Sequence, residues 1–334
     1  MSLLASIPRP SSGTIDIGPL SLPAYGLMIA LGVVAAVWLT GRRLEARGAG
    51  TRDDVSSMAV WAVLAGVIGS RLYHVATEWS SFQDRPLDAL KIWQGGLGIP
   101  GGLLAGIVVG IWATKRRGVD WRVMVTCAAP AIPLAQSIGR WGNWFNQELY
   151  GKATTLPWGL EISPGRVAAA GYPPGTLFHP TFLYESLWNL ALCGFLLLLD
   201  KRRPMRPPRL MGVYLLGYGI GRFWVEGLRI DATSHVGGLR WNQWVALAVI
   251  VGSVVYLVVS GRSAGHDSEA ADEHGDAIAE EHDSEAADDS ETADVTEVAD
   301  EAEVAAEVAD APVPESGPLG EGEYVPTDEP VDER

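Results

Sequence analysis

Three arginines stand where a sequence rarely carries charge, within or at the end of long apolar segments of this 334-residue chain. They are Arg71, Arg140 and Arg222. An arginine near the centre of a bilayer costs about 2.5–3.5 kcal/mol even on the lenient insertion scale, so such residues usually have a function. Guanidinium groups bind phosphate oxygens through paired hydrogen bonds. Because all three are expected at one depth, near one membrane face, they predict a site for an anion, most naturally a phospholipid head group.

Other polar residues are expected at the same depth. They are Tyr25, Tyr73, His74, Asn143, Asn146, Glu148, His179, Glu185, Glu226 and Arg229. Glu226 and Arg229 follow Arg222 by four and seven residues, so all three share one helix face. The alternative is that each arginine only reaches to the interface or pairs with a glutamate. That alternative explains one arginine better than it explains three.

Seven apolar segments must position these residues, and each is long enough to be considered as a membrane span. They are 22–39, 58–77, 97–114, 124–139, 182–199, 210–227 and 241–259. Pro130 and Pro133 interrupt the fourth segment, which a membrane helix can tolerate. The first segment lacks a basic leader and a small-residue cleavage site, so we interpret it as a retained span. The sequence therefore predicts an all-α integral membrane protein with seven transmembrane helices.

The charges between the segments predict the orientation. The loops after the first, third and fifth segments hold thirteen Lys and Arg, and the alternate loops hold six. Basic loops remain in the cytoplasm, so the N-terminus is expected outside and the C-terminus inside. At the inner face the sequence predicts no cluster like the outer one, only loop lysines and arginines.

The composition divides the chain into two domains. Residues 1–262 carry 24 Lys and Arg against 14 Asp and Glu, whereas residues 263–334 carry 26 acids and one base. The second part repeats HDSEAAD at 266–272 and 282–288 and is predicted to be a disordered acidic cytoplasmic tail. Its histidines are interpreted as part of a solvated spacer rather than as metal ligands.

Small residues within the segments favour packing roles. Gly98, Gly102, Gly106 and Gly110 recur every fourth residue, which places them on one helix face where a neighbouring helix can approach closely. Cys127 and Cys193 both lie inside apolar segments. We interpret them as small apolar packing residues, with no disulfide and no metal site.

The segment 139–151, which reads GRWGNWFNQELYG, strongly resembles the signature of the bacterial prolipoprotein diacylglyceryl transferases. Four further motifs resemble that family in order: 25–27 (YGL), 69–74 (GSRLYH), 179–185 (HPTFLYE) and 217–226 (GYGIGRFWVE). The resemblance implies transfer of the diacylglyceryl group of phosphatidylglycerol to the lipobox cysteine of a preprolipoprotein signal peptide. A thioether forms and glycerol phosphate leaves. It implies a multi-pass protein of the bacterial cytoplasmic (inner) membrane with its site toward the outer leaflet, and no cofactor, metal or nucleic acid.

The resemblance also implies roles for residues. Arg140 and Arg222 would hold the head group and stabilise charge on the departing phosphate. Asn143 and Asn146 would donate further hydrogen bonds or order the loop. Glu226 would orient Arg222, and Tyr25 would position the head group or help accept the thiol proton. The residues expected to bind substrate are Arg140, Asn146, Glu148, Arg71, His179, Arg229 and Tyr218. Among these, Glu148 would orient Arg140, and Arg71 would have a supporting role.

One position departs from the family pattern. Many members carry a histidine, proposed as general base, where this chain has Pro100. Either the thiol proton would pass to Tyr25, His74, Glu148, His179 or water, or a general base would not be essential. A thiol with a pKa of about 8.5 is already a few per cent ionised at pH 7, so a weak or remote base suffices.

Two other functions compete with this interpretation. A different membrane transferase with a polyprenyl-phosphate donor would use the same arginines. The signature at 139–151 and the lack of an acidic metal-binding motif in the loops argue against it. A seven-span transporter or receptor is the non-catalytic alternative. Transporters place charges near the midplane between repeated halves, whereas this chain shows no repeat and places its charges off-centre.

Overall fold

The computed structural model describes residues 6–18, 20–83, 85–92 and 95–262. These lie in the compact unit Met1–Glu269. The predicted disordered tail, 263–334, lies outside the described residues.

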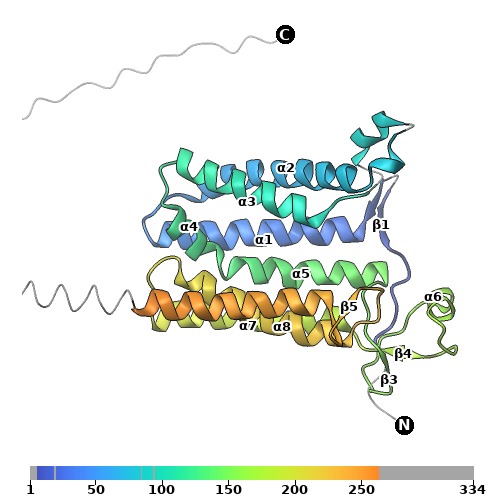
Figure 1. Cartoon of the computed structure of the whole chain (residues 1–334). Helices are drawn as coiled ribbons and strands as arrows, with labels where there is room; N and C mark the ends of the chain where they lie inside the picture. Colours follow the sequence, from blue (N-terminus) through green and yellow to red (C-terminus); the bar gives the residue numbers. More distant parts are fainter. Residues whose placement is uncertain (1–5, 19, 84, 93–94, 263–334) are drawn as a thin grey trace, which may run out of the picture. The chain divides into compact units, whose positions relative to one another are not determined.

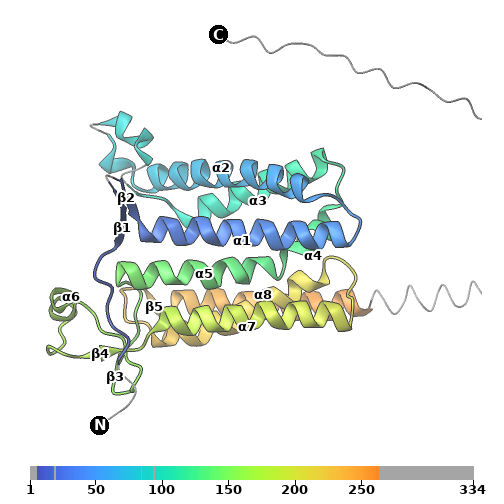
Figure 2. The ribbon, with the colours of Figure 1, turned by 180° about the vertical axis from the view of Figure 1, so that it is seen from behind.

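Long helices lying side by side form most of the described chain (Figures 1 and 2). They are α1 (Ala24–Ala46), α2 (Arg52–Thr77), α3 (Ile99–Arg116), α5 (Ala131–Asn146), α7 (Thr181–Arg202), α8 (Arg209–Leu228) and the C-terminal helix Trp241–Arg262. Helix α1 packs against both α2 and α5, α3 packs on α2, and α7 joins α5 to α8. Shorter helices connect them: η1 (Trp79–Ser81), η2 (Pro86–Leu90), α4 (Trp121–Ala128) and α6 (Pro164–Ala169).

Four of these helices are long and apolar enough to span a membrane: Ala24–Ala46, Arg52–Thr77, Thr181–Arg202 and Trp241–Arg262. The protein is therefore a mostly helical membrane protein. Of the other expected spans, α5 has only 16 residues and α3 ends on Lys115 and Arg116. Helix α8 carries Arg222 and Glu226 within its length.

The structure corrects the prediction in two places. The fourth apolar segment is two helices, because α4 ends at Ala128 and α5 begins at Ala131. Proline lacks the N–H that a continuous helix needs, and Pro130 stands at this junction. The chain is also not purely α-helical. Three antiparallel two-stranded pairs lie at one end of the bundle: β1 (Thr14–Ile17) with β2 (Leu20–Pro23), β3 (Ala153–Thr154) with β4 (Leu177–Phe178), and β5 (His235–Val236) with β6 (Leu239–Arg240).

The glycine face of α3 packs on α2, as predicted. A Cβ at Gly102 would lie 2.0 Å from Ser70 Oγ, and one at Gly106 would lie 3.4 Å from the Ala62 carbonyl oxygen. Helices α1 and α5 are equally close, since a Cβ at Gly32 would lie 2.9 Å from the carbonyl oxygen of Ala135. These crossings depend on residues without side chains, because real Cβ contacts do not fall below about 3 Å.

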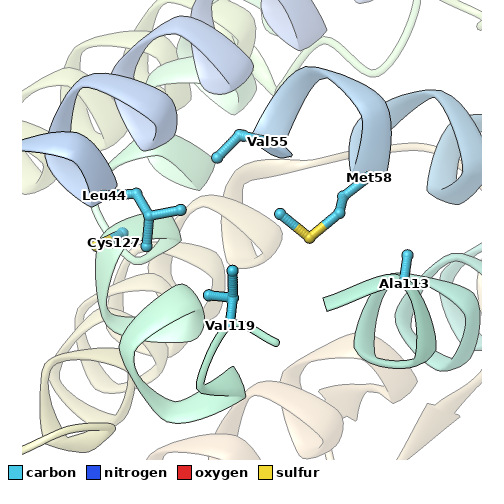
Figure 3. Packing of buried hydrophobic residues seen from close by; sticks show 6 residues of the cluster. All are labelled: Leu44, Val55, Met58, Ala113, Val119 and Cys127. Carbon is cyan, nitrogen blue, oxygen red and sulfur yellow. The ribbon is translucent and has the colours of Figure 1, made fainter. Parts of the chain in front are cut away.

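Cys127 packs in the core at the other end of the bundle, with Leu44, Val55, Met58, Ala113 and Val119 (Figure 3). Both cysteines are free and buried among apolar residues, which confirms their predicted packing role. This end was expected to hold only loop charges, and that expectation is wrong. Arg43, only 8% exposed, donates to the Cys127 carbonyl at 2.9 Å and pairs with Asp200 at 2.9 Å. Arg47 pairs with the same carboxylate, so α1, α4 and α7 are tied together here.

Candidate functional site

Two of the three predicted arginines meet on one carboxylate. Glu185, in the second turn of α7, lies 2.9 Å from Arg140 Nη1 through its Oε2 atom and 3.0 Å from Arg222 Nη1 through its Oε1 atom. The Glu185 side chain is 8% exposed, and those of the arginines are 19% and 18% exposed. The half-buried guanidinium groups of α5 and α8 are therefore brought together by a glutamate from the helix between them.

A second carboxylate holds Arg222 from its own helix. Glu226, one turn further along α8, is fully buried, and its Oε2 atom lies 2.8 Å from Arg222 Nη2 as an ion pair. Its Oε1 atom accepts hydrogen bonds from Arg240 Nε at 2.9 Å and from Asn242 Nδ2 at 3.1 Å. Arg229 Nη1 approaches Oε2 at 3.7 Å. The orientation of Arg222 by Glu226, expected from the sequence, is therefore present as a contact.

Arg240 fastens the loop after α8 to this network. Besides Glu226, its guanidinium donates to the backbone carbonyls of Arg229 at 3.0 Å and Asp231 at 2.9 Å. The Asp231 carboxylate also accepts from Arg229 Nε at 2.7 Å. Although burial raises the pKa of Asp231, the hydrogen bond and charge of Arg229 and the charge of Arg240 outweigh it, so this pKa lies below the ordinary value.

The network has an unequal charge balance. Four guanidinium groups, those of Arg140, Arg222, Arg229 and Arg240, face three carboxylates, those of Glu185, Glu226 and Asp231. The network therefore carries one net positive charge, which one phosphodiester anion would neutralise. Within the described ranges, no three His, Cys, Asp or Glu side chains could hold a metal ion.

Glu148 is not the partner of Arg140, which corrects the expected pairing. Its Oε1 atom accepts from Asn143 Nδ2 at 2.8 Å and its Oε2 atom from Asn146 Nδ2 at 3.4 Å. The backbone explains this, because Gln147 and Leu149 have positive φ angles of 48° and 59°. This left-handed turn at the end of α5 folds Glu148 back over the last turn of the same helix.

Tyr25 lies against α5 at Gly142. A Cβ at Gly142 would be 2.6 Å from the tyrosine ring, so this signature glycine makes room for it. Gly142 follows Arg140 by two residues, which places the two on different faces of α5. Tyr218 instead lines a cavity of about 10 Å³ with Glu185 and Arg222, room for about one water molecule.

His179 lies just before α7 and outside the arginine network. Its Nδ1 atom is 3.2 Å from the hydroxyl of Tyr184, which also accepts a hydrogen bond from Trp158 Nε1 at 3.1 Å. The backbone of His179 pairs with the loop after α5, since Gly151 N donates to its carbonyl at 2.9 Å. This residue therefore connects the strand region to the start of α7.

Arg71 is occupied elsewhere. It is 7% exposed and donates to the carbonyls of Asp88, Ala89, Gly95 and Gly96 at 2.6–3.1 Å. No described residue of the Glu185 and Glu226 network contacts it. The expected convergence of three arginines is thus a convergence of two, while the third holds the segment between α2 and α3. Helix α1 lies between α2 and α5, so equal depth does not make Arg71 and Arg140 neighbours (Figure 1).

Two charged members of the network, Arg240 and Asp231, were not predicted at this site, and Glu185 was expected at this depth without an assigned role. Glu185 is the fourth residue of its apolar segment, and the sequence did not indicate that two arginines share its carboxylate. Arg240 directly precedes the last apolar segment and was interpreted as a loop charge. Nothing in its local sequence indicates that the loop folds back onto Glu226.

Comparison with known proteins gives a consistent result. The family model described as "Prolipoprotein diacylglyceryl transferase" matches residues 12–259. A phosphatidylglycerol–prolipoprotein diacylglyceryl transferase of Streptomyces griseus is 45% identical over 284 residues, which cover 84% of this chain and 85% of the relative. The Streptomyces coelicolor protein numbered 1 under the same name is 48% identical over 78% of this chain and 75% of its own length. The protein of that name in Rhodococcus jostii is 43% identical over 77% of this chain and 75% of its own.

Proposed function

Because this chain belongs to the prolipoprotein diacylglyceryl transferase family, we propose that the network around Glu185 and Glu226 is its catalytic site. The protein transfers the diacylglyceryl group of phosphatidylglycerol to a prolipoprotein. The proposal concerns the location of the catalytic site and the mechanism of the transfer. The observation that supports it is the meeting of Arg140 and Arg222 on one carboxylate, with one positive charge in excess.

In the proposed reaction the thiolate of the lipobox cysteine attacks the glycerol carbon that bears the phosphate ester. A carbon–sulfur bond forms and the carbon–oxygen bond to phosphate breaks, so the electron pair leaves with glycerol phosphate. Arg140 and Arg222 bind the phosphodiester and stabilise the growing negative charge. A guanidinium group has five N–H donors, and the contacts to Glu185 and Glu226 use only some of them.

The remaining residues act around this pair. Glu185 and Glu226 fix the two guanidinium planes, and Arg229 adds a buried positive charge at the end of α8. Tyr218 lines the cavity beside Arg222. Asn143 and Asn146 order the loop through Glu148. Tyr25 and His179 flank the network on α1 and at the start of α7, where they would contact the acceptor peptide or accept its proton.

Pro100 has a structural role at its position. It stands in the first turn of α3, where its fixed φ angle suits a helix start and its missing N–H has no helical partner to lose. Because proline accepts no proton, the thiol proton passes to another group or to water. We therefore expect Pro100→His to change the transfer rate little.

We further propose seven spans, with the site toward the outer leaflet and residues 263–334 in the cytoplasm. The strand pairs lie at the end of the bundle where α5 and α8 end and α7 begins, and the basic loops after α1, α3 and α7 lie at the other end (Figures 1 and 2). The last turns of α5 and α8 and the first turns of α7 carry the arginine network. Basic loops favour the cytoplasm, which leaves the network at the outer end. The acceptor would then be a signal peptide whose lipobox cysteine reaches this depth from within the membrane.

A reconstituted assay tests the site. The protein, phosphatidylglycerol and a lipobox peptide are mixed, and the diacylglyceryl mass gain of the peptide is followed. Arg140→Ala and Arg222→Ala should each lower turnover by about 10²–10³, the usual effect of removing one donor to transition-state charge. Arg117→Ala is the control, because that arginine pairs with Asp54 at the opposite end of the bundle. Full turnover in either site variant would show that the arginine is not part of the catalytic machinery.

A further inference from the structure

Helices α1 and α2 enclose a groove of about 560 Å³ away from the arginine network. Its walls are apolar, with Val33, Val37 and Trp38 on α1 and Ala59, Val63 and Leu64 on α2. The polar side chains that line it, Arg52 and Ser56, lie at one end. Helices α3 and α5 pack elsewhere on α2 and α1, so this face is left open: Val63 is 42% exposed and Leu64 is 51% exposed.

The open end of the groove carries positive charge. Arg52 is more than half exposed, and its Nε atom pairs with Glu45 at 2.7 Å. Among the described residues, its two terminal nitrogens have no partner. Arg42 lies over the ring of Trp38 with its guanidinium carbon 5.8 Å from the ring centroid. Arg42 and Arg52 therefore outnumber Glu45, the one carboxylate that pairs with either of them, where the groove meets the loop after α1.

The length of the groove fits one leaflet. Twelve residues separate Arg52 from Leu64 on α2, which is about 18 Å at 1.5 Å per residue. Half of a typical hydrocarbon core is about 15 Å. Trp38 lies at the charged end, at the depth where tryptophans collect at membrane interfaces.

We propose that this groove binds one acyl chain of an anionic phospholipid, with its phosphate on Arg52 and Arg42. This is a second lipid site, separate from the one that supplies the diacylglyceryl group. Its placement in the inner leaflet rests on the proposed orientation, whereas the groove and its charge do not. Valine side chains contact the acyl chain, and the small side chains of Ser56 and Ala59 leave room for it.

Photo-labelling in nanodiscs tests this site. The probes are phosphatidic acid and phosphatidylcholine that carry the same diazirine acyl chain, and the labelled peptides are identified by mass spectrometry. We expect phosphatidic acid to label 33–38 and 59–64 about thirtyfold more than phosphatidylcholine does, the factor that about 1 kcal/mol for each of the two arginines gives. Arg52→Gln should reduce this preference to about fivefold, the factor that Arg42 alone gives. Arg116→Gln is the matched control, since Arg116 also lies over a tryptophan at the end of its helix but does not line this groove.

A second variant tests the proposal by filling the groove. Ala59→Trp should fill the groove and abolish labelling at 33–38, whereas Ala191→Trp on the exposed face of α7 should not. Equal labelling by the two probes would mean bulk lipid only, and cross-links to a second copy of the chain would mean a protein interface. Either result overturns the proposal. Transfer activity is measured on the same samples, and Ala59→Trp should retain it. An inactive wild-type protein that keeps the labelling preference would count against the catalytic proposal alone.

Discussion

Replacing Glu185 with glutamine removes the negative charge that Arg140 and Arg222 share, with almost no change of shape. Two opposite charges about 4 Å apart interact by about 4 kcal/mol at an effective dielectric constant of 20. Removing one partner of a buried pair costs about 3–5 kcal/mol. Glutamine still accepts a hydrogen bond, and the arginine side chains keep 18–19% exposure to solvent, so we take the lower end, about 3 kcal/mol. Expressed in the transition state, this lowers kcat/KM about 100-fold.

The assay follows diacylglyceryl transfer at varied phosphatidylglycerol, so that kcat and KM are separated. Without Glu185 the two guanidinium groups keep their charge but lose their alignment. We therefore expect kcat to fall while KM for the anionic lipid stays the same or decreases. A merely structural role would instead lower the melting temperature and the amount of active protein and leave kcat per active molecule intact. The control is Glu78→Gln, an exposed carboxylate at the end of α2. The reasoning is refuted if KM rises while kcat is unchanged, or if Glu185→Gln matches the wild type in both.

Four further results are expected. Gly142→Ala drives a methyl group to 2.6 Å from a packed tyrosine ring and should cost about 1–3 kcal/mol of stability, whereas Gly139→Ala, which meets nothing within 4 Å, should be neutral or stabilising in a thermal melt. Arg71→Gln removes donors to four carbonyls, so hydrogen exchange should rise over residues 79–98 and transfer should fall less than in Arg140→Ala. The lowered pKa of Asp231 means that its contribution to stability is full above the ordinary value of 3.8 and is lost as the pH falls below it; the difference in melting temperature between the wild type and Asp231→Asn should shrink over that range. Removing residues 263–334 should leave turnover unchanged, and a dead truncation would contradict the spacer interpretation of the tail.

The sequence predicts how far along its helix a charged residue lies better than it predicts which residues it contacts. Charge in apolar segments placed Arg140, Arg222 and Glu226 in one site because burying a charge is costly wherever it occurs. The same argument placed Arg71 with them, yet its guanidinium group donates hydrogen bonds to backbone carbonyls of the loop after α2. Position along a helix fixes how deep a residue lies, but its partners depend on helix rotation and on which helices are adjacent. Only the packed structure shows that α1 separates α2 from α5.

The remaining differences arise from the backbone and from long-range contacts. Apolar content alone extended the fourth segment through Pro130, although proline ends one helix and starts another there. The pairing of Glu148 with Asn143 required the positive φ angles at Gln147 and Leu149. Neither glutamine nor leucine indicates such an angle from the sequence. Arg240 reaches Glu226 because the loop between α8 and the last helix folds back, and a contact of that kind leaves no local sequence signal.

The buried link of Arg43 to Asp200 and to the Cys127 carbonyl joins α1, α4 and α7 at the end of the bundle remote from the strand pairs. Helices that are held together at one end can separate most at the other end. If the helices part to admit a two-chained donor sideways, the opening is widest where Glu185 bridges its arginines and narrowest at the clamp. Such an opening would admit the lipid from the side of the bundle while the end held by Arg43 and Asp200 stays closed.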